Sequence, residues 1–337
     1  MSMATRNDLS ASDPWGGYDI TDDYWRSRYY ILADRGYTLR DHFCPDKQPT
    51  TRNSSRPWND VPDGIDARIP GGKLVIVRRM STDSQELSLL LKFSQPEMRS
   101  APGNLCVPVY AVFEDPDDPS STFVVTPHLF MVYQLQWRNL DDILNYISRV
   151  LEGLVFFHSH GISNVLPCCP DPDFPVRFDL STIVYNGDWN AVNPLRSLAR
   201  PNYTFFERNY YWMRDTVPFY LFHLHHCRIE TSIRDQESSS PPAYSPPGKN
   251  PTSPLPAPST RAAMTPGMKS DLRSVSQALI LEQYTNVSDV FFGLDFLRQF
   301  RQDLESENPP DALTALRRFR ELHYSRSWLK RRFWFLG

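Results

Sequence analysis

Hydrophobic and polar positions along the chain predict a mixture of helices and strands. The strongest pattern covers residues 140–159, where apolar side chains recur at the spacing of one helix face: Ile143, Ile147, Leu151, Leu154 and Phe157. His160-Gly161 follows this helix as a stop signal. Weaker helical patterns predict five further helices, over residues 22–39, 85–93, 270–284, 290–304 and 310–323.

Runs of β-branched and apolar residues predict two hairpins ahead of the long helix. Residues 66–79 form the first, around the turn Pro70-Gly71-Gly72, and residues 107–126 form the second, around an acidic turn. The apolar run 217–224 predicts one more strand. Residues 163–216, rich in Pro, Asn and Trp, give no readable pattern.

Composition excludes several classes of function for these 337 residues. With 36 Lys+Arg against 39 Asp+Glu there is no basic field, so we expect no nucleic-acid binding. Five cysteines without a C-x-x-C pair indicate free thiols in a reducing compartment. The polar first 20 residues do not resemble a signal peptide, and no apolar run reaches the length of about 18 residues that spans a bilayer. We therefore expect an intracellular protein, cytoplasmic or nuclear, with no transmembrane segment.

Residues 236–260 differ in composition from the rest of the chain. They hold eight of the 30 prolines, together with many serines and threonines, and this composition predicts a polyproline-like loop or linker. Ser245-Pro246, Thr252 through Pro254, and Thr265-Pro266 offer proline-directed phosphorylation sites. Two interpretations stay open: a phosphorylatable or adaptor-docking loop, and a tolerated surface insertion.

The order of these elements resembles that of a protein kinase domain. Residues 73–79 resemble the third strand of the small lobe, and residues 85–93 resemble the helix that supplies the glutamate partner of the ATP-anchoring lysine. Residues 151–162, ending in His158-Ser159-His160-Gly161-Ile162, are similar to the helix that leads into the catalytic loop. Asp271-Leu272-Arg273-Ser274-Val275 resembles the large-lobe helix whose aspartate holds that loop.

More narrowly, three segments resemble the divergent kinase-like proteins that are abundant in mushroom-forming fungi. They are Tyr24-Trp25 with the following Arg35–Arg40, then Asn104-x-Cys106-Val107-Pro108-Val109, and the closing Trp328–Arg332. The match covers about residues 24–162 and 268–332 and is weak between them.

The resemblance implies an α+β, two-lobed protein kinase-like fold. In order along the chain, it implies a disordered lead (1–23), a small antiparallel β lobe with one helix and an N-terminal extension (24–129), a larger and mainly helical lobe (130–332) carrying a Pro/Ser-rich insertion (235–267), and a tail (333–337).

The resemblance also places the nucleotide-binding positions of the small lobe. Arg78 stands where the family has its lysine, with Glu86 or Ser88 in the partner register. Thr126 falls at the gatekeeper position and His128 in the hinge. Arginine keeps the charge, but its planar fork cannot act as a point charge between two phosphates. The alternative is that Arg78 is a solvated charge at the end of a strand and Glu86 a residue on the surface of a helix.

The catalytic positions are degenerate by the same comparison. Where the family has H-R-D, this chain has Asn164-Val165-Leu166, and leucine can neither accept a proton nor orient a hydroxyl. His225 stands at the place of the D-F-G aspartate, and a neutral histidine cannot replace a carboxylate on magnesium. Phe178-Asp179 is a rival placement for that motif, and Asp171 a displaced base.

These losses predict a pseudokinase, a catalytically inactive scaffold or regulator that binds proteins of unknown identity. The alternative is a weakly active or atypical Ser/Thr kinase that uses ATP and Mg²⁺ with Arg78, Asp171 or Asp179 in unusual roles. A third hypothesis is a relic with no ligand. His223, His225, His226 and Cys227 have zinc-competent chemistry, but their spacing is too tight for a tetrahedral set, so we expect no cofactor and no metal.

Overall fold

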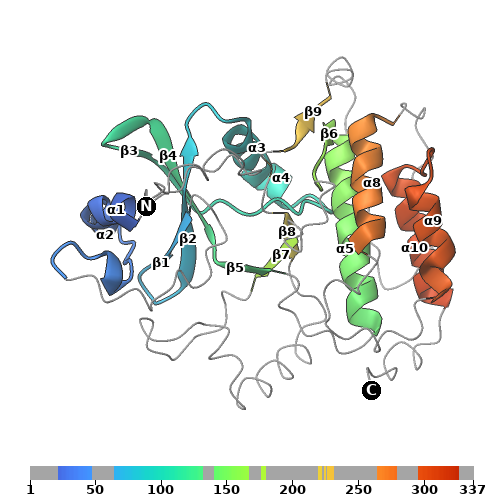
Figure 1. The fold of residues 1–337 in the computed structure, drawn as a ribbon, viewed down its shortest axis with the longest axis horizontal. Coiled ribbons are helices and arrows are strands. Elements are labelled where there is room, and N and C mark those ends of the chain that lie inside the picture. Colours follow the sequence, from blue (N-terminus) through green and yellow to red (C-terminus); the bar gives the residue numbers. More distant parts are fainter. Residues whose placement is uncertain are drawn as a thin grey trace, which may run out of the picture. The chain divides into compact units, whose positions relative to one another are not determined.

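The computed structural model describes residues 22–47, 64–131, 140–166, 176–179, 219–221, 224, 226–230, 264–278 and 295–325. This part of the chain is mixed α and β, with a four-stranded antiparallel sheet and several helices, so the predicted α+β class is confirmed (Figure 1). The chain divides into two compact units. Of the described residues, the first unit holds 22–47, 64–84 and 109–128, and the second holds the others.

The first unit is built on the antiparallel sheet. Its strands are β1 (Gly64–Arg68), β2 (Leu74–Ser81), β3 (Ala111–Asp115) and β4 (Asp118–Pro127), in the order β1-β2-β4-β3. The hairpins β1–β2 and β3–β4 are the two that the sequence predicts. Gly71 and Gly72 both have positive φ in the first turn, a conformation that glycine adopts at little cost.

Two short helices cover one face of this sheet. They are α1 (Asp22–Ser27) and α2 (Tyr29–Asp34), followed by a 3₁₀ turn, η1 (Asp41–Phe43). Trp25, Leu32 and Leu39 pack against the side chains of one sheet face, which are Ile65, Ala67, Val75, Val77, Phe123 and Val125. The single helix expected over 22–39 is wrong, because the backbone of Arg28 interrupts it, but the predicted stop is confirmed by Gly36 at φ 85°.

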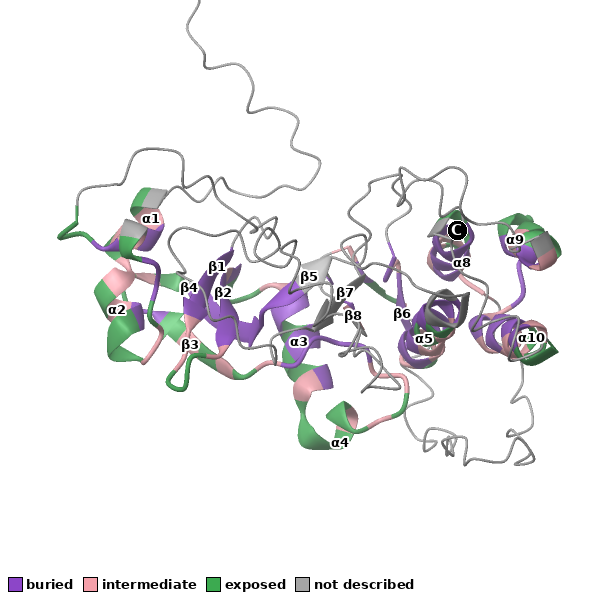
Figure 2. Ribbon diagram, turned by 90° about the horizontal axis from the view of Figure 1, so that it is seen from below, coloured by how far each residue is buried: buried purple, intermediate pink, exposed green. Residues whose placement is uncertain are grey.

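Helices dominate the second unit. They include α5 (Leu140–Ser159), α8 (Pro266–Ala278), a 3₁₀ turn η5 (Asp295–Leu297), α9 (Arg298–Glu305) and α10 (Ala312–Ser325). Helix α5 packs against both α8 and α10, and their buried residues are purple in Figure 2. The bounds predicted for α5 are confirmed, whereas α8 begins four residues before the expected start because Pro266 is accommodated in its first turn.

The second unit also holds α3 (Gln85–Ser94) and α4 (Pro96–Arg99). Helix α3 follows the prediction, and its Phe93 ring packs against Phe156 and Phe157 of α5 with centroids 5.5 and 5.3 Å apart. The side chain of Asn104 closes the turn after α4, donating to the carbonyls of Phe93 and Met98 at 2.9 and 2.8 Å.

The described residues of the second unit also form five short strands. β5 (Leu129–Met131), β7 (Val176–Asp179) and β8 (Phe219–Leu221) form an antiparallel sheet in the order β5-β7-β8. β6 (Ile162–Ser163) pairs with β9 (Arg228–Ile229). Of these, only the region of β8 was predicted as a separate strand. None of the described helices is long and apolar enough to cross a membrane.

Candidate functional site

In the first unit, Arg78, Thr126 and His128 lie on or beside the sheet. Arg78 of β2 pairs in register with Val124 of β4, and Thr126 pairs with Ile76. Because side chains alternate along a strand, Arg78 and Thr126 point to the face opposite the Trp25 core. Arg78, Thr126 and His128 are buried, at 4, 0 and 3% exposure. The alternative that Arg78 is a solvated charge at a strand end is wrong, because β2 continues to Ser81 and the side chain is enclosed.

The hydroxyl of Thr126 is a buried polar group on this face. It makes no hydrogen bond with any described residue. A buried hydroxyl without a hydrogen-bond partner lowers the free energy of unfolding by about 1–3 kcal/mol. A threonine with a purely structural role would therefore destabilise the fold at this position.

An acidic side chain on the same face is already neutralised. Asp66 of β1 pairs in register with Ile76, which puts its carboxylate on the Thr126 side of the sheet. Arg40 donates to it from Nε and Nη2, both at 2.7 Å. Arg40 reaches this point because Thr38 pairs with Arg68 at the edge of β1.

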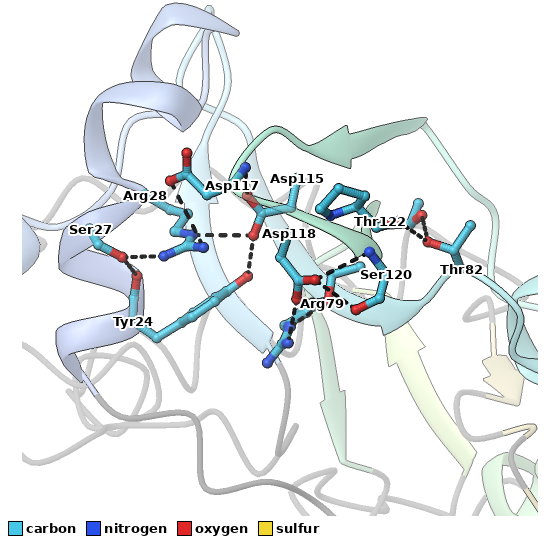
Figure 3. Close-up of polar contacts among 12 residues, drawn as sticks. Tyr24, Ser27, Arg28, Arg79, Thr82, Asp115, Asp117, Asp118, Ser120 and Thr122 are labelled. Carbon is cyan, nitrogen blue, oxygen red and sulfur yellow. Dashed lines mark hydrogen bonds and ion pairs between the residues drawn. The ribbon is translucent and has the colours of Figure 1, made fainter.

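A polar network fixes the N-terminal helices to the β3–β4 hairpin (Figure 3). The Tyr24 hydroxyl donates to Asp115 Oδ2 at 2.8 Å, and Arg28 Nε donates to the same oxygen at 3.2 Å. Burial of the phenol, together with its hydrogen bond to the Asp115 carboxylate, raises the pKa of Tyr24 well above its usual value. Because each of these groups is engaged by another, this network holds the helices in place and leaves no reactive group.

The neighbouring carboxylate, Asp118, is held by three side chains. The hydroxyls of Ser120 and Ser121 and the Arg79 guanidinium donate to it, at 2.6, 2.7 and 2.8 Å (Figure 3). These hydrogen bonds lower the pKa of Asp118 well below its usual value. Arg79 is thus committed to the first residues of β4.

In the second unit, the predicted catalytic loop is held by Asp271 of α8. The Leu166 amide donates to Asp271 Oδ1 at 2.7 Å, and His158 Nε2 lies 2.9 Å from Oδ2, which accepts the second hydrogen bond. Ser274, one turn further along α8, donates to the Leu166 carbonyl at 3.1 Å. Burial raises the pKa of Asp271, and the hydrogen bonds from His158 and the Leu166 amide oppose that shift. Asp271 thus contacts both the Leu166 backbone and the end of α5 at His158.

The side chains of the same loop offer no acid–base group at the predicted position. Val165 and Leu166 are fully buried, and Asn164 takes a left-handed backbone with φ 55°, which asparagine tolerates better than most residues. The backbone of Leu166 is therefore held by Asp271 and Ser274, while residues 164–166 carry no acidic or basic side chain.

Two side chains of helix α3 form hydrogen bonds with the backbone of the stretch between β8 and β9. The buried carboxylate of Glu86 accepts from the Leu224 amide at 3.3 Å, and Gln85 Nε2 donates to the Cys227 carbonyl at 2.9 Å. The alternative that Glu86 is a surface residue is therefore wrong. His225, predicted at the D-F-G aspartate position, lies outside the described residues, and so does His223.

The cysteines and potential metal ligands give no second site in the described part of the chain. There, no three His, Cys, Asp or Glu side chains come close enough to hold a metal ion. Cys44, Cys106 and Cys227 are free and buried, as expected for reduced thiols. Burial raises the pKa of Cys106 and Cys227 far above that of an exposed thiol, so both are poor nucleophiles near neutral pH.

Sequence reasoning missed Gln85 and Ser274 as residues that hold the loops. Each contacts backbone that lies more than 100 positions away, at Cys227 and Leu166 respectively. A polar side chain that bonds to distant backbone leaves no local pattern, so only a resemblance could have pointed to them.

Comparisons with protein-family models and with curated proteins found no match to this chain.

Proposed function

We propose that this chain is a catalytically inactive protein with a two-lobed kinase-like fold, a pseudokinase that acts by binding other proteins. The observation that carries the proposal is at Leu166. Its amide is bound by Asp271, as expected of a kinase catalytic loop, while its side chain, at the place of the catalytic base, is apolar and fully buried. Such a side chain cannot take a proton from a substrate hydroxyl.

The kinase-like fold is supported by contacts within each unit. In the first unit, Arg78 is buried in mid-strand and the gatekeeper candidate Thr126 lies on the same face. In the second, the loop segment β6 pairs with β9, and α8 supplies the aspartate that binds the loop backbone. The resemblance assigns these roles to Arg78, Thr126 and Asp271, whereas it made no prediction for the pairing of β6 with β9.

The residues present do not fit a magnesium–ATP site of the kinase type. Magnesium takes oxygen ligands, and the sequence has His225 where the resemblance places the D-F-G aspartate that holds the metal. Arginine in place of lysine at position 78 removes the point charge between two phosphates. Loss of a general base alone costs about 10²–10⁴-fold in rate.

The weakly active alternative gains no support from the described residues. Asp179, its candidate metal ligand, is part of β7, where its backbone pairs with Leu129 in the middle strand of a sheet. Asp171, its candidate base, lies outside the described residues.

Thermal unfolding of the purified full chain with ATP, in the presence and absence of Mg²⁺ or Mn²⁺, tests the proposal together with transfer of labelled phosphate. A ligand at 100 times its Kd stabilises a protein by about 2.7 kcal/mol, which is readily seen. We expect no metal-dependent rise in melting temperature and no transfer. A metal-dependent shift together with transfer that Asp171→Asn or Asp179→Asn abolishes would overturn the proposal.

The pair Arg78→Met and Arg79→Met separates nucleotide binding from general destabilisation. Both remove a guanidinium from β2, but only Arg78 lies on the Thr126 face, whereas Arg79 pairs with Asp118. A metal-independent shift with ATP that Arg78→Met removes and Arg79→Met keeps would support a pseudokinase that retains nucleotide without transferring phosphate.

A further inference from the structure

The segment that follows α2 reaches round the edge of the four-stranded sheet with one side chain. Thr38 exchanges two backbone hydrogen bonds with the edge strand β1, at 2.8 and 2.9 Å. Leu39 then packs with Trp25 on one face of the sheet. The next side chain, that of Arg40, binds Asp66 on the opposite face. The N-terminal segment therefore covers one face of the sheet and places a single charged group on the other.

Both partners of this ion pair are enclosed. Arg40 is 9% exposed and Asp66 is 4% exposed, and two charge-assisted hydrogen bonds of 2.7 Å hold the guanidinium to the carboxylate. Removing two charges from water costs several kcal/mol per ion, so a pair of apolar side chains would stabilise the fold at least as well. Stability alone therefore does not account for this pair.

The ion pair shares a cross-strand row with Thr126. Asp66 lies opposite Ile76 of β2, and Ile76 lies opposite Thr126 of β4. Neighbouring strands are about 4.8 Å apart, so Asp66 and Thr126 are separated by about 10 Å across the sheet. Arg78 lies two residues along β2 from Ile76 and shares this face. The Arg40 guanidinium is thus held on the face that carries the positions assigned by resemblance to a nucleotide.

We propose that the Arg40–Asp66 pair is an autoinhibitory contact that keeps a nucleotide from the Thr126 face. The inference rests on the proposed function, because it gives the inactive protein a further reason to hold no ATP. The flat faces of a purine ring need apolar surface, and directly opposite side chains such as Asp66 and Ile76 have Cβ atoms about 5 Å apart. A guanidinium held to Asp66 therefore takes the place of a base beside Ile76.

Isothermal titration of the full chain with ATP, in a chelator and without divalent metal, tests the contact. The wild type should show no saturable binding at millimolar ATP. The variant Arg40→Ala/Asp66→Ala removes both charges together, so neither is left buried without the other. We expect it to bind ATP at least about tenfold more tightly than the wild type. Arg78→Met in that background should weaken the binding, since it removes a cation from the same face.

Arg79→Ala/Asp118→Ala is the matched control. It removes an ion pair of 2.8 Å from the same sheet, but Arg79 lies against the Tyr24 ring on the opposite face (Figure 3). This variant should bind ATP no better than the wild type. Wild-type binding as tight as that of Arg40→Ala/Asp66→Ala would overturn the proposal, and so would an equal gain by the control or no gain by a folded Arg40→Ala/Asp66→Ala chain.

Asp66→Ala, measured in parallel, keeps the test decisive if the double variant does not fold. It leaves Arg40, whose long side chain can turn from the sheet edge to solvent, and should also raise the affinity for ATP. A folded Asp66→Ala chain that binds no better than the wild type would refute the contact.

Failure of the inference is distinguishable from failure of the proposed function. Variants that gain no affinity, with no phosphate transfer by any chain, would sink only the autoinhibitory contact. Phosphate transfer with Mg²⁺ by Arg40→Ala/Asp66→Ala but not by the wild type would sink only the pseudokinase proposal, because the face would then be a working site that the ion pair closes.

Discussion

Two buried carboxylates of the second unit accept hydrogen bonds from backbone amides. Asp271 binds the Leu166 amide, and Glu86 binds the Leu224 amide. A buried carboxylate costs several kcal/mol unless hydrogen bonds compensate, so each must be matched by a fixed donor. The resemblance to kinases pointed to both residues, but it gave Glu86 a charged partner on the neighbouring strand. The backbone contact at Leu224 depends on a residue 138 positions away, and sequence pattern carries no information at that range.

The burial of Arg78 could have been predicted from alternation alone. Leu74, Ile76 and Met80 share its face of β2, and all three are buried. A charged residue that lies in a row of buried apolar residues is expected to be enclosed with them, and not to be solvated at the end of the strand. Thr126, whose hydroxyl makes no hydrogen bond with a described residue, has no such signal, because threonine is common in strands whether or not its hydroxyl is bonded.

Asp118 provides a test of the electrostatics at the start of β4. Its pKa in the folded protein is lowered by the donors Ser120, Ser121 and Arg79, so its stabilising contribution is complete above the ordinary aspartate pKa of about 3.9 and is lost as pH falls through the folded value. Asp118→Asn should therefore be less stable than the wild type at neutral pH, and the difference should shrink in acid. Urea unfolding at about pH 7 and pH 3 measures it.

Asp117→Asn is the control for this test. Asp117 is more exposed, and its ion pair with Arg28 is long at 3.9 Å, so the substitution should change stability little at either pH. A stability difference for Asp118→Asn that stays constant or grows in acid would show that the amide disturbs packing and that charge is not the cause.

At the scale of elements, helices and strands were predicted correctly where their pattern of apolar residues is long and regular. Helix α5 was predicted from end to end because five apolar positions repeat on one face and Gly161, at φ 69°, ends it. The strands β6 and β9 were missed because each has two residues and owes its conformation to a partner more than 60 positions away. The break between α1 and α2 was missed because Arg28 is a good helix former that bonds here to Asp115.

The approach of α8 to β6 depends on a glycine. An alanine inside a helix is usually about 1 kcal/mol more favourable than glycine, but at Gly267 the added Cβ would overlap both side-chain atoms of Ser163. Overpacking of this kind costs about 1–3 kcal/mol, so we expect Gly267→Ala to lower the free energy of unfolding by about 2 kcal/mol. Chemical denaturation of the full chain measures this change.

Two further variants identify the cause. Ser163→Gly removes the two atoms nearest to the new Cβ and leaves Asn164 Oδ1 at 3.2 Å, so Gly267→Ala should cost less in that background than in the wild type. Gly153→Ala in α5 is the control, because there the nearest atom is the end of the Leu105 side chain, which can move. An equal loss for Gly267→Ala with and without Ser163→Gly would refute the steric argument.

At the scale of the whole molecule, the described elements are joined by chain that sequence patterns resolve poorly. The sheet β5-β7-β8 brings together residues near 130, 177 and 220, and no local signal predicts such an arrangement. The two hairpins, in contrast, join neighbours along the chain and were predicted. The limit of the sequence analysis is therefore set by how far apart the contacting residues lie.

Ser163 bonds to Glu230, and Gly267 lies beside the same serine, so the chain leaves and returns to the second unit at one place. We therefore predict that residues 231–263 can be shortened without unfolding this unit. Each halving of a loop's length lowers the entropic cost of closing it by about 0.6 kcal/mol, so a Gly/Ser linker of one quarter the length should stabilise the protein by about 1.2 kcal/mol. Calorimetry of the shortened chain should show a melting temperature equal to that of the wild type or about 2–4 °C higher. A version with the residues of 231–263 in scrambled order keeps length and composition and is the matched control. A shortened chain that melts well below both would show that these residues belong to the folded core and are not an insertion.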